Sequence, residues 1–220
     1  MIISRHKLIY IHAPKTAGNA IQSLLFDISD DDKIVYHHQN GVDRFEVSGP
    51  ITFSKHSALR IYNNGLGNNL SGWRVMVSIR HPFERAISAY FSPHRWYKQD
   101  TQETWTLQNP VWDETQFFDY ITPKPLGQYQ LITSYLCVND IIHKPDVVLR
   151  HTHLQSDLDA AVNKLGLPVL SAMPQLNQSI GSQTLRNKLL SSMDLRSRVE
   201  TIAQRDMDFF NFETGKIPSQ

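Results

Sequence analysis

The pattern of apolar and polar positions predicts two strand–loop–helix units. In the first, Lys7–His12 holds a short apolar, β-prone run, and a turn that ends at Gly18 follows it. After Gly18, the apolar residues Ile21, Leu24 and Leu25 recur at i, i+3 and i+4, which is typical of one face of a helix. The N-terminal part of the chain is therefore predicted to run from a buried strand through a loop into a helix.

The clearest strand of the chain, Trp73–Ile79, begins a second unit of the same kind. It runs into Arg80 and His81, and the next residue, Pro82, suits the first position of a helix. Apolar residues then recur at i, i+3, i+4 and i+7, namely Phe83, Ala86, Ile87 and Tyr90. This spacing predicts an amphipathic helix directly after the loop.

Weaker patterns predict the remaining elements. Further strands are expected at Lys33–Tyr36, Ile51–Ser54 and Val147–Arg150. Helices are expected at Ser57–Tyr62, Thr115–Ile121, Gln128–Tyr135 and Leu154–Leu165, with one or two more in Gln183–Phe210, where Asp194 is a candidate cap. Three polar stretches are expected to be loops: His37–Val47, Ser92–Pro110 and Pro168–Ser182.

These elements predict an α/β fold. Strands that alternate with helices form a mostly parallel sheet with helices on both faces. The chain has 220 residues and shows no internal repeat or low-complexity linker, so a single domain over residues 1–220 is expected.

Composition narrows the function classes. Lys+Arg 22 against Asp+Glu 21 gives a net charge of +1, which argues against a nucleic-acid partner or a polybasic membrane anchor. One cysteine, Cys137, excludes an intrachain disulfide framework and a cysteine-cluster zinc site. No apolar stretch reaches the roughly 18–20 residues of a membrane span. We therefore expect a soluble, cytoplasmic protein.

The first loop has the features of an anion site. Free N–H groups at a helix start favour a phosphate, and Gly18 allows close backbone approach. Lys15 adds a charge, while Thr16 and Asn19 add side-chain donors. The G-x-x-x-x-G-K-[ST] spacing of a Walker A loop is absent. The alternative interpretation is a tight turn with a solvent-facing lysine.

The second loop supplies an arginine at the carboxyl end of a strand, where open α/β sheets bind ligands. The guanidinium of Arg80 and the hydroxyl of Ser88, two turns into the following helix, are suited to hold a phosphate monoester. The alternatives are a salt bridge for Arg80 and an ordinary helix serine for Ser88. Arg85 is expected to be structural and to pair with a carboxylate.

Together the two loops resemble the cofactor segments of sulfotransferases that use 3′-phosphoadenosine 5′-phosphosulfate. Ile11-His12-Ala13-Pro14-Lys15-Thr16-Ala17-Gly18 is similar to the P-K-T-A-G-T-S type 5′-phosphosulfate loop. Arg80-His81-Pro82-Phe83-Glu84-Arg85-Ala86-Ile87-Ser88-Ala89-Tyr90 is similar to the R-x-P-x-x-R-x-x-S-x-Y type 3′-phosphate segment. The resemblance is closest to the carbohydrate-type group, which includes uronyl 2-O-sulfotransferases and soluble bacterial relatives.

The resemblance implies the P-loop-like sulfotransferase fold and a set of binding residues. The donor would be held by Lys15, Thr16, Ala17, Gly18, Asn19, Ala20, Arg80 and Ser88. Lys15 would also neutralise the charge that grows on the leaving 5′-phosphate during in-line transfer. Asn19 and Ala20 stand where the family pattern prefers hydroxyl residues. No metal is expected, because a sulfuryl group carries less charge than a terminal phosphoryl group.

The acceptor is expected to be a hydroxyl group on a carbohydrate, and its activation needs a general base. His56 resembles the base histidine that the 2-O-sulfotransferase group places between its two cofactor segments. The alternative is a histidine that caps a helix or bonds a carbonyl. We interpret His12 as a structural histidine at a strand end. The other histidines considered as metal ligands are expected to be solvated: His37, His38, His94, His151 and His153.

Two other functions compete with sulfuryl transfer. A small-molecule kinase would need magnesium ligands and a contact to a terminal phosphate, and the sequence offers neither. A non-catalytic nucleotide- or glycan-binding module is favoured only by Asn19 and Ala20.

Overall fold

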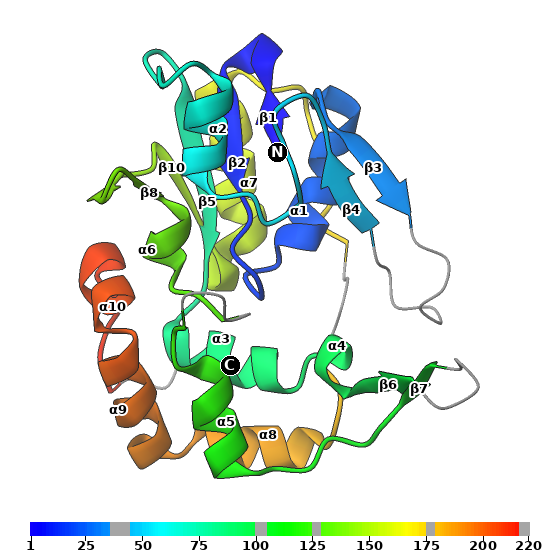
Figure 1. Ribbon diagram of the computed structural model, residues 1–220, viewed down its shortest axis with the longest axis vertical. Helices are drawn as coiled ribbons and strands as arrows, with labels where there is room; N and C mark the ends of the chain where they lie inside the picture. Colours follow the sequence, from blue (N-terminus) through cyan, green and yellow to red (C-terminus); the bar gives the residue numbers. More distant parts are fainter. Residues whose placement is uncertain (36–44, 100–104, 125–128, 175–178, 216–220) are drawn as a thin grey trace. The chain divides into compact units, whose positions relative to one another are not determined.

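The computed structural model describes the chain apart from residues 36–44, 100–104, 125–128, 175–178 and 216–220 (Figure 1). The chain divides into two compact units, each formed by two stretches of sequence. The first unit comprises Met1–Arg80 and Ile132–Leu176, and the second comprises His81–Leu131 and Asn177–Gln220. The expectation of one domain over residues 1–220 stays a prediction.

A four-stranded sheet with the order β1-β2-β5-β10 forms the centre of the first unit. The strands are β1 (Ile2–Ile3), β2 (Leu8–Ile11), β5 (Arg74–Ile79) and β10 (Val147–Arg150). β5 pairs in parallel with both β2 and β10, while β1 is antiparallel to β2. All four residues of β2 are buried, as expected for a strand covered on both faces. The predicted α/β fold with a mostly parallel sheet is confirmed.

Helices cover this sheet. They are α1 (Gly18–Leu25), α2 (Leu59–Gly65) and α7 (Leu154–Leu165). Ile21 of α1 and Leu158 of α7 share one apolar core with Leu8 and Tyr10 of β2. Figure 1 shows α2 in front of the sheet and α7 behind it. α7 ends at Gly166, whose φ of 64° is the left-handed conformation that a helix terminus favours.

Short elements complete the first unit. They are β3 (Asp32–Val35), β4 (Phe45–Ser48), α6 (Ile132–Tyr135), β8 (Cys137–Val138), β9 (Ile141–Ile142) and the 3₁₀ turns Ser4–His6, Phe26–Ile28 and His151–His153. β3 pairs antiparallel with β4, and β8 with β9.

The prediction of a strand at Ile51–Ser54 is wrong. The partner of β3 is β4, in which Phe45 and Val47 are buried and alternate with half-buried residues. The same finding corrects the end of the polar loop predicted at His37–Val47, because residues 45–47 belong to β4, while residues 37–44 lie outside the described residues. Residues 51–54 have no ladder partner in the part of the chain that the structure describes, and the hydroxyl of Thr52 donates instead to Oδ2 of Asp31 at 2.8 Å.

The second unit is mainly helical. It contains α3 (Pro82–Tyr90), α4 (Pro93–Trp96), α5 (Glu114–Ile121), α8 (Gln183–Leu190), α9 (Met193–Ile202), α10 (Gln204–Phe210) and the hairpin of β6 (Tyr97–Gln99) and β7 (Trp105–Leu107). Side chains at the N-cap positions accept hydrogen bonds from the first main-chain N–H groups of several helices. The side chain of His81 accepts from the N–H of Phe83 at α3, and the side chain of Asp113 caps α5.

Three predictions in this part of the chain are corrected. Ser92–Pro110 is not a plain loop, because it contains α4 and the β6–β7 hairpin. The cap of α9 is Ser192, whose side chain accepts from Leu195 N–H, so Asp194 lies inside the first turn. The helix predicted at Gln128–Tyr135 is the single turn Ile132–Tyr135, and residues 125–128 lie outside the described residues.

Candidate active site

Within the first unit, three polar residues follow the carboxyl ends of parallel strands. His12 follows β2, Arg80 follows β5 and His151 follows β10. Since β5 lies between β2 and β10, the sheet order places Arg80 between the other two strand ends. This edge is where open α/β sheets bind ligands.

The loop from β2 to α1 is held in an unusual backbone conformation. Lys15 and Ala17 have φ values of 69° and 68°, which is the left-handed region that side-chain-bearing residues rarely adopt. α1 then begins at Gly18. The N–H groups of Ala20 and Ile21 both reach Ala17 O, whereas those of Gly18 and Asn19 have no acceptor among the described residues. Left-handed residues before a helix start are the geometry of an anion-binding nest.

A buried chain of hydroxyl groups fastens this loop to the sheet. The hydroxyl of Thr16 donates to Ala13 O at 2.7 Å, so Ser78 Oγ, at 2.7 Å, must donate to Thr16 Oγ1. The hydroxyl of Tyr10 then donates to Ser78 Oγ at 2.8 Å. The side-chain donor expected at Thr16 is therefore engaged within the loop, and only its main-chain N–H is left to meet an anion.

Gly18 is required by a close approach. A Cβ added there would stand 1.8 Å from Cδ2 of His12, so only glycine leaves room for the imidazole. His12 is buried, and its Nδ1 lies 2.8 Å from Oε1 of Gln22. The interpretation of His12 as a structural histidine agrees with this packing.

Positive charges gather at the strand ends. Burial lowers the pKa of Lys15 to about 8, and the charges of Arg80 and Lys55 act in the same direction. Lys55 also donates from Nζ to Phe45 O at 3.0 Å and pairs with Glu46 at 3.5 Å. The structure thus brings Lys55 and Arg80 each within electrostatic range of Lys15. Like charges held together in a partly buried place favour an anionic ligand.

His151 differs from the expectation of a solvated histidine. It is half-buried, and burial followed by the charge of Arg80 lowers its pKa to about 4. The register explains this proximity, because Arg150 pairs with Ile79 and the next residues on the two strands are His151 and Arg80. The sequence alone could not show it, because the pairing of β10 with β5 is not written in either segment.

His56 lies beside the first loop. Its Nδ1 is 3.0 Å from His12 O, and since a carbonyl only accepts, Nδ1 carries the proton. The other ring nitrogen, Nε2, therefore has the lone pair of a base in the neutral ring. The rings of His56 and His12 meet edge to face with centroids 4.3 Å apart. The carbonyl bond was the alternative interpretation of His56, and the structure shows that bond at Nδ1.

The start of α1 also offers a polar atom for a ligand. Asn19 Oδ1 is buried without a hydrogen-bond partner among the described residues. Exchanging the amide nitrogen and oxygen would place an N–H donor at this point, which would suit a phosphate. Ala20 is buried, with 4% exposure, so its side chain packs inside. The loop therefore offers an anionic group its main-chain N–H groups, Lys15 and Asn19.

Ser88 belongs to the second unit, on α3, and its predicted role stays a prediction. It is buried, and its Oγ lies 3.2 Å from Oγ of Ser179. Arg85 on the same helix is 1% exposed, and its guanidinium stacks over the ring of Tyr129 at 4.5 Å. This burial agrees with the structural role predicted for Arg85, and the predicted pairing with a carboxylate stays a prediction.

Sequence reasoning missed two residues. Gln22 and Ser78 are both fully buried; Ser78 bonds Thr16 of the first loop, and Gln22 bonds His12 and Lys55. Gln22 sits beside Ile21 on α1, four residues after Gly18, so a polar residue on a buried helix face was the available signal. Ser78 interrupts the apolar run of β5 and carried the same signal.

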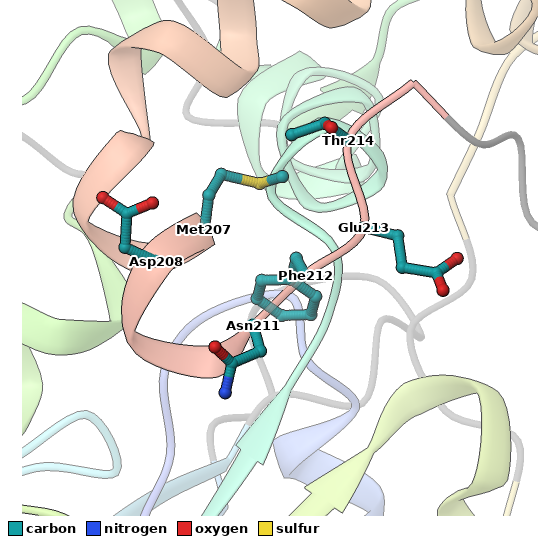
Figure 2. Close-up of a pocket in the computed structure, with 6 residues that line it drawn as sticks. All are labelled: Met207, Asp208, Asn211, Phe212, Glu213 and Thr214. Atoms are coloured by element: carbon teal, nitrogen blue, oxygen red, sulfur yellow. The ribbon is translucent and has the colours of Figure 1, made fainter.

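An open pocket of about 460 Å³ lies in the second unit at the end of α10. It is lined by Met207, Asp208, Asn211, Phe212, Glu213 and Thr214. In Figure 2 the carboxylates of Asp208 and Glu213 lie on opposite sides of Phe212. Two acidic side chains make it unsuited to a doubly phosphorylated nucleotide, and it contains none of the predicted site residues.

The described residues contain no group of three or more His, Cys, Asp or Glu side chains placed to hold a metal ion. None of the helices in these ranges has the length and apolar character needed to traverse a bilayer.

Comparison with known proteins supplies the family. No curated protein and no solved structure matches the chain. The model of the sulfotransferase family matches residues 1–213, which is nearly the whole chain and includes both predicted cofactor segments. The chain therefore belongs to the sulfotransferase family, whose members are enzymes of sulfuryl transfer.

Proposed function

We propose that this protein transfers a sulfuryl group from 3′-phosphoadenosine 5′-phosphosulfate to a hydroxyl group of a carbohydrate, with His56 as the general base. The observation that carries the proposal is that Lys15 lies within electrostatic range of both Arg80 and Lys55, while His56 bonds the main chain of His12 at the start of the same loop. A doubly phosphorylated donor needs cations at both phosphates, and a hydroxyl acceptor needs a base close by.

Different residues act on the acceptor and on the two phosphates of the donor. The acceptor oxygen attacks sulfur while its proton passes to Nε2 of His56. The bond between sulfur and the bridging oxygen of the phosphosulfate breaks, and the electron pair leaves with the 5′-phosphate. Lys15 and the N–H groups of Gly18 and Asn19 stabilise the charge that grows on that phosphate. Arg80 is assigned to the 3′-phosphate, because it follows the neighbouring strand.

Binding measurements test the donor. Calorimetric titration with adenosine 3′,5′-bisphosphate is expected to show tight binding, and Mg-ATP is expected to bind much more weakly. Tight binding of Mg-ATP alone would reject the proposal in favour of a kinase.

Transfer measurements test the chemistry and the acceptor. Radiolabelled sulfate from the donor is followed onto a panel of glycans and small alcohols. Label on glycans supports the proposed acceptor class, and label on simple alcohols alone moves the acceptor to another class of hydroxyl compounds. Bisphosphate binding with no transfer to any hydroxyl in the panel points to a non-catalytic binding module.

Replacing the base gives the largest expected loss of turnover. His56→Ala should lower kcat by about 10²–10⁴-fold, because the acceptor proton loses its recipient, with bisphosphate affinity retained. The matched control is His153→Ala, which removes an exposed imidazole that bonds only Thr152 among the described residues. Normal turnover in His56→Ala would mean that another group is the base.

A further inference from the structure

A buried amide on α1 connects the donor loop with the segment that carries His56. Gln22 is fully buried and makes two side-chain hydrogen bonds. Its Nε2 donates to Lys55 O at 3.1 Å, and its Oε1 lies 2.8 Å from Nδ1 of His12. Lys55 directly precedes His56, so one amide holds both the strand end and the base segment.

The proton positions in this network follow from its partners. Because the amide nitrogen of Gln22 faces a carbonyl, its oxygen faces His12, and His12 Nδ1 must donate. Burial lowers the pKa of His12 well below its usual value, and the neighbouring His56 acts in the same direction. The ring of His12 is therefore neutral, with its single proton directed to Gln22.

Two residues on one face of α1 fix the position of the His12 ring. Gly18 and Gln22 are four residues apart, so they lie on the same side of the helix. Gly18 leaves the space that the imidazole fills, and Gln22 fixes its rotation through Nδ1. His12 in turn presents its carbonyl to His56 Nδ1 at 3.0 Å and its ring to the ring of His56. The helix that begins at the donor loop thereby sets where the base lies.

We propose that Gln22 is a positioning residue that orients His56 through His12 O and Lys55 O, so that Nε2 faces the acceptor. This inference rests on the proposed function, in which His56 is the base. It assigns Gln22 a part in catalysis without contact to the donor or the acceptor. The reason is geometric: a base displaced by about 1 Å loses on the order of 10²-fold in rate.

The test is a double-mutant cycle on kcat. Gln22→Met keeps the shape of the side chain and removes both hydrogen bonds. We expect kcat to fall by about 10- to 100-fold, with the KM for the donor and the affinity for adenosine 3′,5′-bisphosphate changed less than about threefold. In a His56→Ala background the same substitution should lower the residual rate by less than about threefold, because no base remains to be oriented.

Two further variants keep the test sharp. Ser23→Ala is the control on the same helix, where the Ser23 hydroxyl bonds only Ala20 O among the described residues, and it should leave kcat unchanged. Gln22→Glu is close in size and keeps an acceptor for His12 but loses the donor to Lys55 O, so it should also lower kcat. The thermal midpoint of each variant is measured, and Gln22→Glu takes the place of Gln22→Met in the cycle if the latter fails to fold.

The outcomes separate this inference from the proposed function. An equal loss from Gln22→Met in both backgrounds, or a loss seen only in the donor KM, overturns the positioning role while His56 remains the base. Normal turnover in His56→Ala alone instead removes the base assignment. A non-additive cycle with retained bisphosphate affinity supports both.

Discussion

Lys15 in the first unit and the buried arginines of the second unit have opposite surroundings. Burial lowers the pKa of Lys15 to about 8, and the like charges of nearby Arg80 and Lys55 act in the same direction. In the second, Arg85 stacks on Tyr129 at 4.5 Å, and Arg196 lies over Phe83 and pairs with Glu200 at 3.4 Å. Cations neutralised by rings and carboxylates hold a fold together, whereas crowded cations are arranged for a ligand.

The segment that resembles the 3′-phosphate motif contains both kinds of cation. Arg80 and Arg85 are five residues apart, yet one follows a strand of the first unit and the other lies on the buried face of α3. We therefore predict that loss of Arg80 weakens ligand binding and that loss of Arg85 lowers the stability of the fold.

The largest effect expected from the comparison concerns Arg80. Arg80→Ala should weaken binding of adenosine 3′,5′-bisphosphate by about 2–4 kcal/mol, or roughly 30- to 900-fold, because a charge-assisted pair is truncated. Calorimetry measures this loss, and the thermal midpoint should stay nearly constant. Arg60→Ala, an exposed arginine on α2, is the control. Unchanged affinity in Arg80→Ala would remove it from the site.

Arg85 should show the reverse. Arg85→Met removes a buried guanidinium from the face of Tyr129, which should lower the free energy of unfolding by about 2 kcal/mol or more. Denaturant unfolding measures it. Bisphosphate affinity of the folded protein should change less than about threefold. A large loss of affinity at full stability would mean that the contrast between the two arginines is false.

Gly18 probes the packing beneath the donor loop. Gly18→Ala places a methyl group against the His12 ring and should cost about 1–3 kcal/mol of stability through overpacking. The double variant Gly18→Ala/His12→Ala should recover part of this loss, because the ring is gone. Thermal unfolding of the four proteins of this cycle measures the coupling. Additive losses would show that the close approach is relieved in another way.

The smallest effect is a pH dependence of binding. The pKa of Lys15 is about 8 in the free protein, and a bound anion favours the ammonium and raises that pKa. Binding therefore takes up a proton above pH 8, and affinity should fall by about 8-fold between pH 7.5 and pH 9, where phosphates are already fully ionised. Lys15→Arg should flatten this decline, and an equal slope in both proteins would assign it to another group.

The sequence predicted most of what positions the site. The central strands, α1, α3 and α7 follow from apolar runs and i, i+3, i+4 spacing, because these patterns record burial directly. Both loops were located because each follows a strand and precedes a helix. Lys15 and Arg80 were predicted as site residues from their residue types and from their positions after a strand. The sequence does not show that they lie close together.

The rest depends on contacts between distant segments. The neighbourhood of His151 and Arg80 follows from a strand register that neither segment encodes. β4 was not predicted because residues 45–48 and 51–54 show the same alternation of apolar and polar residues, and only the structure shows that the first pairs with β3 while Thr52 of the second bonds Asp31. The role of Gln22 was not predicted, because its hydrogen-bond partners, His12 and Lys55, lie 10 and 33 residues away along the chain.

The hydroxyl chain through Tyr10, Ser78 and Thr16 limits how this loop can be engineered. Residues 13–18 cannot be moved alone into another protein and keep their conformation. That conformation depends on the side chain of Tyr10 in the preceding strand and on that of Ser78 in the next parallel strand. A transplant into another scaffold would have to carry all three hydroxyl positions. Directed evolution of donor preference should therefore vary the two strands together with the loop.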